Sequence, residues 1–130
     1  MYAVKLNTQL EIEIVEKKPD QGILDFCYQN IGCQYVETVH PRYLRDPFVL
    51  IIDEEGRLKE KPEINFIASY LYGTHEHHEP IVGKAMILKI GMTSEGPDIL
   101  PLDAAEARQV EESMKKNAHI AYRKVLVAFR

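Results

Sequence analysis

The chain has 130 residues, of which 45% are hydrophobic and 28% are charged, as in an ordinary single globular domain. Its formal net charge of −4, from 16 basic and 20 acidic side chains, argues against binding of bulk nucleic acid. The longest apolar runs, residues 48–52 and 125–129, are far shorter than the roughly twenty residues of a membrane helix. The first residues lack the basic start and long apolar stretch of a signal peptide. We therefore expect a cytoplasmic protein that binds neither bulk nucleic acid nor a membrane.

The first third of the chain alternates between strand-like and helix-like patterns. Residues 2–6 and 10–15 have strand-like compositions, and in the second run Leu10, Ile12 and Ile14 alternate with polar residues, which predicts an antiparallel hairpin with one wet face. A helix face follows at the spacing i, i+3, i+4, i+7, and Gly32 is placed to end that helix. The residues of this face are Leu24, Cys27, Tyr28 and Ile31. The spacing of Cys27 and Cys33 fits neither a redox pair nor a zinc site, so both thiols are expected to face the core.

Two more strands and a helix are expected in the middle of the chain. Residues 33–39 and the apolar run 48–52 predict the strands, and the acidic turn 53–55 leads to Gly56, which is able to adopt a positive φ. Pro62 is suited to the first position of a helix that ends at Gly73. Residues 74–80 are expected to form a polar loop rich in histidine, residues 81–90 a strand, and residues 91–101 a further loop with a short strand at 99–100.

The last third begins with the clearest signal. Asp103 and Glu106 predict a capping box, and an apolar face then extends to Ala118. Residues 124–129 are β-prone and predict a terminal strand whose free edge adds a homo-oligomer contact. The whole pattern predicts one α+β domain, with a largely antiparallel sheet and about three helices packed on it.

Several landmarks resemble those of a family of small bacterial and phage proteins, domain-of-unknown-function family 3846. In chain order they are Ile31-Gly32-Cys33-Gln34-Tyr35-Val36-Glu37, Ile52-Asp53-Glu54-Glu55-Gly56-Arg57-Leu58, Pro62 with Asn65, Ala68, Leu71-Tyr72-Gly73 and Ile81-Val82-Gly83-Lys84-Ala85. The resemblance covers residues 2–90, and it departs from the family pattern where Cys33 replaces a second glycine after Gly32. It implies a setting among phage and mobile-element genes, whose small products tend to be binders or inhibitors.

A basic and aromatic connector is the main candidate for ligand binding. The guanidinium groups of Arg42 and Arg45 suit phosphate or carboxylate, and Tyr43 between them offers a stacking face. A solvated connector is the plainer interpretation. The full set of candidate ligand-binding residues is Arg42, Tyr43, Arg45, Arg57, Asn65 and Tyr70. Asn65 could equally fix the turn before its helix, and Tyr70 could pack against the histidine-rich loop.

Two other clusters give alternative interpretations. His75, His77 and His78 could supply metal ligands, but they lack the HExxH pattern on a helix and are expected to be solvated. An acidic face that includes Glu54, Glu55, Glu76 and Glu79 suits a protein partner, although alternating surface charge explains it as well.

Function is therefore stated as an ordered set of hypotheses. No nucleophile elbow, phosphate loop or dinucleotide motif is present in the sequence, so we expect no enzyme and no cofactor. The first hypothesis is a phage-type accessory protein that counters host defence by sequestering a small nucleotide signal. The second is an inhibitor or regulator that binds a host protein, and the third is a metal-dependent hydrolase.

Overall fold

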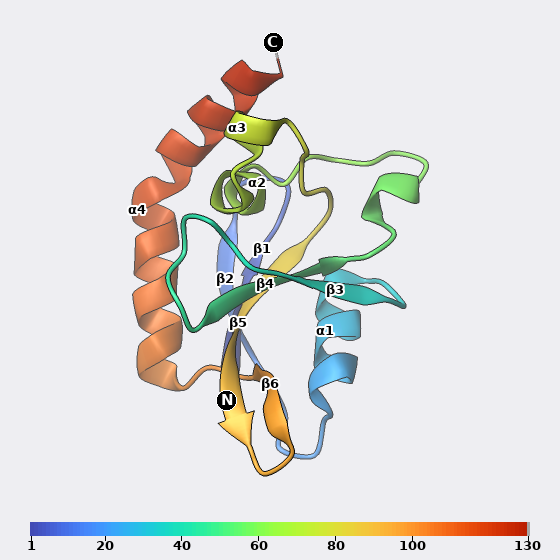
Figure 1. Ribbon diagram of the computed structural model, residues 1–130, viewed down its shortest axis with the longest axis vertical. Coiled ribbons are helices and arrows are strands. Elements are labelled where there is room, and N and C mark those ends of the chain that lie inside the picture. Colours follow the sequence, from blue (N-terminus) through green and yellow to red (C-terminus); the bar gives the residue numbers. More distant parts are fainter. Residues whose placement is uncertain (130) are drawn as a thin grey trace.

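A computed structural model describes residues 1–129 and places six antiparallel strands in one sheet (Figure 1). The strands are β1 (Tyr2–Leu6), β2 (Ile12–Glu16), β3 (Val36–Val39), β4 (Phe48–Asp53), β5 (Ala85–Thr93) and β6 (Gly96–Leu100). The helices are α1 (Ile23–Ile31), α2 (Phe66–Tyr72), α3 (Thr74–His77) and α4 (Ala104–Ala128), with a 3-10 turn η1 (Gly56–Leu58). The expected α+β fold with a largely antiparallel sheet and three main helices is confirmed.

The sheet lies between two helical layers, α1 on one face and α2 with α4 on the other (Figure 1). The strand order is β2-β1-β5-β4-β3, and β6 pairs with the far half of β5. Phe26 and Cys27 of α1 pack on one face, and Ile67, Val110 and other residues of α2 and α4 pack on the opposite face. Burial on both faces explains why β4, which lies between β5 and β3, has a continuous apolar run rather than an alternating one.

The hairpin and the end of the first helix match the sequence predictions, but the predicted helix face is wrong in part, because Phe26 is buried on the sheet and Leu24 is 47% exposed. β1 and β2 pair antiparallel, and α1 ends at Gly32, which adopts a left-handed φ of 78°. Cys27 is buried as expected, and burial, followed by the neighbouring Cys33, raises the pKa of its thiol to about 12. Cys33 is only half-buried, so the expectation that it faces the core holds in part.

The predicted terminal strand is wrong, because residues 124–128 continue α4. This helix is 25 residues long and begins with the predicted capping box between Asp103 and Glu106. No glycine or proline interrupts the segment, and buried Ala121 and Val125 continue the apolar face of Val110 and Met114. The edge strand expected to form a homo-oligomer contact is therefore absent from this segment. No helix within residues 1–129 has the length and apolar character needed to cross a membrane.

The helix predicted to begin at Pro62 begins four residues later. Asn65 is its N-cap, and the Asn65 side chain accepts a hydrogen bond from the N–H of Ala68 at 3.0 Å. Residue 64 instead forms a bridge with Val82, so the chain after Pro62 is extended rather than helical.

Two predicted loops also differ from the structure. The loop expected over residues 91–101 is the β5–β6 hairpin, and the histidine-rich loop contains the short helix α3. Gly56 does not have a positive φ. Its lack of a side chain matters for another reason, because a Cβ there would lie 2.9 Å from Cγ2 of Val82.

Candidate functional site

The β3–β4 connector that carries the predicted basic and aromatic residues is fastened to the end of α2. The backbone N–H groups of Arg42 and Tyr43 both donate to the carbonyl oxygen of Leu71, at 2.8 and 3.0 Å. Gly73 then turns the chain from α2 into α3 with a φ of 87°, and the Thr74 hydroxyl donates to the carbonyl of Glu79 at 2.6 Å. The connector, α2 and α3 therefore meet at one place with fixed geometry.

Three aromatic rings gather at this meeting point. Tyr43 stacks on Tyr70, with 5.3 Å between ring centroids, and Tyr70 stacks on His75 at 5.2 Å. The Tyr43 and His75 rings are also 5.3 Å apart. We call Tyr43, Tyr70 and His75 the aromatic cluster. Tyr43 remains 42% exposed, so one ring of the cluster presents a face to solvent.

The second half of α4 lies beside α3 and adds a hollow to this cluster (Figure 1). Stacking of Phe66 on Tyr122, with centroids 4.8 Å apart, aligns this half of α4 with α2. The hollow has a volume of about 480 Å³ and joins apolar and basic side chains. It is lined by His75, Ile120, Arg123, Lys124 and Val127, and we call it the α3–α4 hollow.

Positive charge is in excess around the α3–α4 hollow. Arg42 pairs with Glu76, with 2.6 Å between Nη1 and Oε2, while Arg123 and Lys124 line the hollow. Three cations and one carboxylate leave a surplus of two positive charges among these groups.

This environment favours the neutral form of the His75 imidazole. Burial lowers its pKa first, and the charges of Lys124, His77 and Arg42 lower it further. Its Nδ1 atom is buried without a hydrogen-bond partner among residues 1–129, and its Nε2 atom lies 3.6 Å from a Glu76 oxygen. The site therefore combines a stacking surface, unsatisfied hydrogen-bonding capacity and cations that a bound anion would neutralise.

The structure brings together only part of the predicted set of ligand-binding residues. Arg42, Tyr43 and Tyr70 meet at the aromatic cluster, and Arg45 is exposed on the same connector. Arg57 does not join them, because η1 lies on the opposite side of the molecule from α4 (Figure 1). Its guanidinium donates to the carbonyl of Pro80 at 3.0 Å.

Asn65 is fully buried, so it has no surface with which to contact a ligand. Its amide nitrogen donates to the carbonyls of Leu6 and Gly83, both at 2.9 Å, and its oxygen caps α2. These bonds give Asn65 the second of its two predicted roles, fixing the backbone before its helix, and we leave it out of the candidate site.

Both ring nitrogens of His77 have hydrogen-bond partners, in contrast to Nδ1 of His75. Nε2 of His77 lies 3.1 Å from the carbonyl of Tyr72, and Nδ1 accepts from the N–H of Glu79 at 3.1 Å. Within residues 1–129, no three side chains of His, Cys, Asp or Glu are grouped so as to hold a metal ion.

Sequence reasoning missed the part of the site that comes from α4. Arg123, Lys124 and the apolar pair Ile120 and Val127 lie at i, i+3, i+4 and i+7. That spacing predicts one helix face, but it was hidden because the segment from Lys124 onward was interpreted as a strand.

The comparison with protein families gives one match, to a family whose function is not known. The family described as Domain of unknown function (DUF3846) matches residues 1–115. The chain belongs to the DUF3846 family. The DUF3846 match extends beyond the resemblance over residues 2–90 and reaches into α4, although the α4 residues that line the hollow follow residue 115. No curated protein and no solved structure matches the chain.

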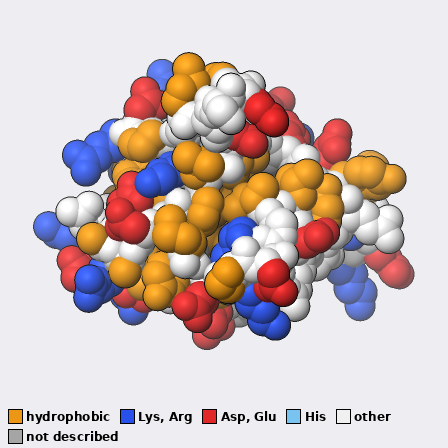
Figure 2. Space-filling view, turned by 90° about the horizontal axis from the view of Figure 1, so that it is seen from below, with side chains coloured by type: hydrophobic (Ala, Val, Ile, Leu, Met, Phe, Trp, Pro, Cys, Tyr) orange, Lys and Arg blue, Asp and Glu red, His pale blue; other side chains and the backbone are white. Residues whose placement is uncertain are grey.

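The end of the molecule opposite α3 has a different surface. Figure 2 views that end and shows apolar side chains across the middle, with Lys, Arg, Asp and Glu interspersed around them. Mixed charge of this kind is typical of a solvated surface. It contrasts with the excess of cations beside the aromatic cluster.

Proposed function

We propose that this protein binds a small, phosphate-bearing, nucleotide-like ligand at the aromatic cluster and the α3–α4 hollow. The single observation that carries the proposal is the position of Lys124 and Arg123 beside a stack of three aromatic rings. A base would stack on the exposed face of Tyr43 or cover the apolar wall of the hollow. Its phosphate would pair with the two α4 cations.

The proposed role is sequestration rather than turnover. The cations and rings are arranged to hold an anion, and the aromatic cluster provides a binding surface without a paired nucleophile and base. We further propose that the protein acts in the cytoplasm of a bacterial host and counters host defence by removing a nucleotide signal. This wider role rests on the setting that the family resemblance implies, and it requires the nucleotide binding that is tested next.

The proposal is tested with a panel of cyclic nucleotides and cyclic ADP-ribose isomers. Thermal shift and native mass spectrometry of the purified protein would report binding, retained ligand and oligomeric state together. We expect at least one member of the panel to bind. Lys124→Glu should weaken its binding by at least about tenfold, because the variant replaces attraction to phosphate with repulsion.

Lys116→Glu is the matched control, because Lys116 is exposed on α4 outside the hollow. It makes the same charge change and should leave affinity unchanged. A panel that yields neither a thermal shift nor a retained ligand contradicts the proposal. Equal losses in the two variants would contradict the assigned site. The homo-oligomer expected from the sequence stays a prediction, which the same mass spectra test.

A further inference from the structure

The outer edge of β3 is an open hydrogen-bonding surface. β3 ends the strand order and pairs only with β4, and the N–H of Glu54 donates to the carbonyl of Tyr35 at 3.0 Å. Because hydrogen-bonded pairs alternate in antiparallel strands, this bond directs the backbone groups of Val36 and Thr38 away from β4. Within residues 1–129, those outward groups have no protein partner.

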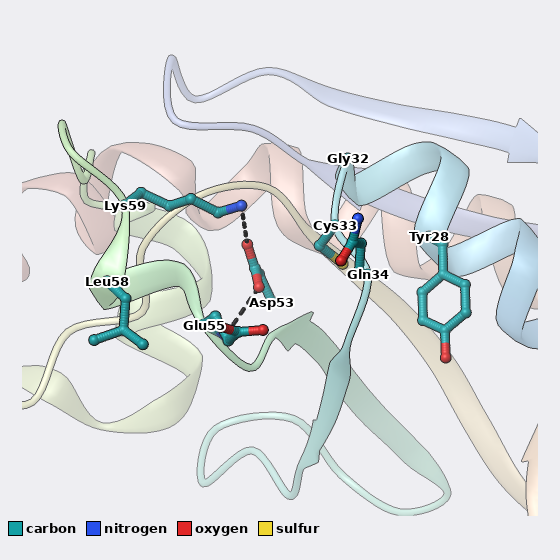
Figure 3. Close-up of a pocket in the computed structure, with 8 residues that line it drawn as sticks. All are labelled: Tyr28, Gly32, Cys33, Gln34, Asp53, Glu55, Leu58 and Lys59. Carbon is teal, nitrogen blue, oxygen red and sulfur yellow. Dashed lines mark hydrogen bonds and ion pairs between the residues drawn. The ribbon is translucent and has the colours of Figure 1, made fainter.

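A hollow lies next to the start of β3, on the α1 face of the sheet. Figure 3 shows the side chains of Cys33, Gln34 and Asp53 converging there from the α1–β3 turn and the end of β4. Its volume is about 570 Å³. The Asp53 side chain is only 9% exposed, and Lys59 approaches it loosely, with 3.6 Å between Nζ and Oδ2. An arginine side chain, which can bind a carboxylate through two hydrogen bonds, can therefore compete with Lys59 for Asp53.

A second hollow lies on the α2 face beside the same edge. It has a volume of about 390 Å³, and Glu37 and Val39 of β3 line it together with Tyr72 of α2. Asp53 and Leu58 line both hollows and separate them. Successive side chains of a strand point to opposite faces, so a strand added to β3 would direct them alternately toward the two hollows.

The surroundings of the two hollows are acidic. The charged residues that line them are Glu37, Asp53, Glu54, Glu55, Glu79, Arg57 and Lys59. Five carboxylates and two cations give a surplus of three negative charges. An 80% exposed Leu58 at the ridge adds an apolar contact point between the acids.

We propose that the edge of β3 accepts an extended, basic segment of a partner protein as an additional strand. The backbone groups of Val36 and Thr38 pair with the segment, and its basic side chains enter the acidic hollows. Charge complementarity selects a basic partner over a second copy of this chain, because two β3 edges would bring two acidic surfaces together. This proposal is independent of the nucleotide-like ligand proposed for the α3–α4 hollow.

The other end of the strand order provides an internal comparison. β2 also has an open edge, where the register directs the backbone groups of Ile12 and Ile14 outward. The hollow near it is lined by two lysines and two glutamates, so its charges balance. A basic segment therefore has an electrostatic preference for β3 over β2.

The test uses a short synthetic peptide of alternating valine and arginine, and a counterpart with glutamate in place of arginine. Amide hydrogen exchange of the whole protein, measured by NMR, reports which strand edge the peptide covers. We expect the arginine peptide to slow exchange at Val36 and Thr38 but not at Ile12 and Ile14. We also expect it to bind at least about tenfold more tightly than the glutamate peptide.

Two variants separate the backbone contribution from the charge contribution. Thr38→Pro removes an outward N–H at an edge position where proline is tolerated, and Thr38→Ala is its matched control. The proline variant should lose protection and binding, while the alanine variant retains both. Glu55→Gln with Glu37→Gln leaves the backbone unchanged and should weaken binding of the arginine peptide alone.

Several results would overturn the proposal. These are absence of arginine-peptide binding, binding without protection at Val36 and Thr38, equal protection at β2, and equal affinity for the glutamate peptide. If Thr38→Pro does not fold, the double glutamine variant still tests the proposal. Unchanged affinity of that variant for the arginine peptide would overturn the proposal.

Discussion

α4 and β3 lie on opposite sides of the view in Figure 1, and the surfaces beside them, the α3–α4 hollow and the edge of β3, carry opposite charge. The first joins aromatic rings with a surplus of two positive charges. The second joins open backbone groups with a surplus of three negative charges. The formal net charge of −4 is a sum over the whole chain, so it does not reveal that the two surfaces have opposite charge. A modest net charge therefore excludes a long polyanion without excluding a small anionic ligand.

The largest expected loss of stability comes from substitution of Asn65, because its side chain holds the start of α2 against β1 and against the segment before β5. Asn65→Ala leaves the carbonyls of Leu6 and Gly83 and the N–H of Ala68 without their side-chain partner. We expect a loss of about 3 kcal/mol in the free energy of unfolding. Urea unfolding measures it, and a loss below about 1 kcal/mol would show that Asn65 does not hold these segments together.

A smaller loss of stability is expected from substitution of Gly56, which lies beside the acidic hollows near β3. Gly56→Ala would place Cβ 2.9 Å from Cγ2 of Val82 and 3.2 Å from its carbonyl oxygen. We expect about 1–2 kcal/mol of destabilisation, and partial recovery when Val82→Ala is added, since this removes one of the two contacts. Thermal unfolding measures both changes.

The same variants sharpen the comparison between the two surfaces. NMR chemical shifts should change around β3 in Gly56→Ala and stay constant at Tyr43 and His75. Comparable changes at both places would mean that the two surfaces are coupled rather than separate.

The smallest effect is a pH dependence confined to the α3–α4 hollow. The pKa of His75 is lowered in the folded protein, so the unfolded chain binds more protons as the pH falls below the ordinary histidine value of about 6.5. This contribution to the free energy of unfolding is present above that pH and is lost as the pH falls through the folded-state pKa. Urea unfolding at a series of pH values measures it, and His75→Phe should remove it while retaining an aromatic ring.

An anion in the hollow should have the opposite influence on His75. Pyrophosphate is the simplest probe, because its negative charge would offset Lys124 and Arg42 and raise the imidazole pKa. NMR titration of the His75 ring measures the shift. If the pKa of His75 does not change at saturating pyrophosphate, the phosphate does not bind beside the aromatic cluster, and the proposed site is wrong.

Local patterns were sufficient to predict much of the fold. The β1–β2 hairpin, the end of α1 at Gly32 and the capping box of α4 each depend on residues close together in the sequence. The terminal strand was wrong because the β-prone composition of residues 124–129 was weighed without the apolar face that continues through Ala121 and Val125.

Long-range contacts explain what the sequence could not predict about the candidate site. The packing of Tyr70 against the histidine-rich loop was one of its two predicted roles, but nothing local indicates that Tyr43 stacks on Tyr70 or that Lys124 lies beside His75. Asn65 was identified as a landmark, yet its role depends on Leu6, 59 residues away. The family match likewise names no ligand.

The two ends of α4 are held with unequal strength. The first turn has its capping box, and Lys89 adds an ion pair to Glu106 at 2.7 Å, whereas the last fully buried residue is Val125. Helices fray from the end with fewer restraints, so α4 opens from its C-terminal turn, beside the hollow. A ligand seated on Arg123, Lys124 and Val127 would close that end, and protection of α4 from proteolytic trimming would then report occupancy without any label on the ligand.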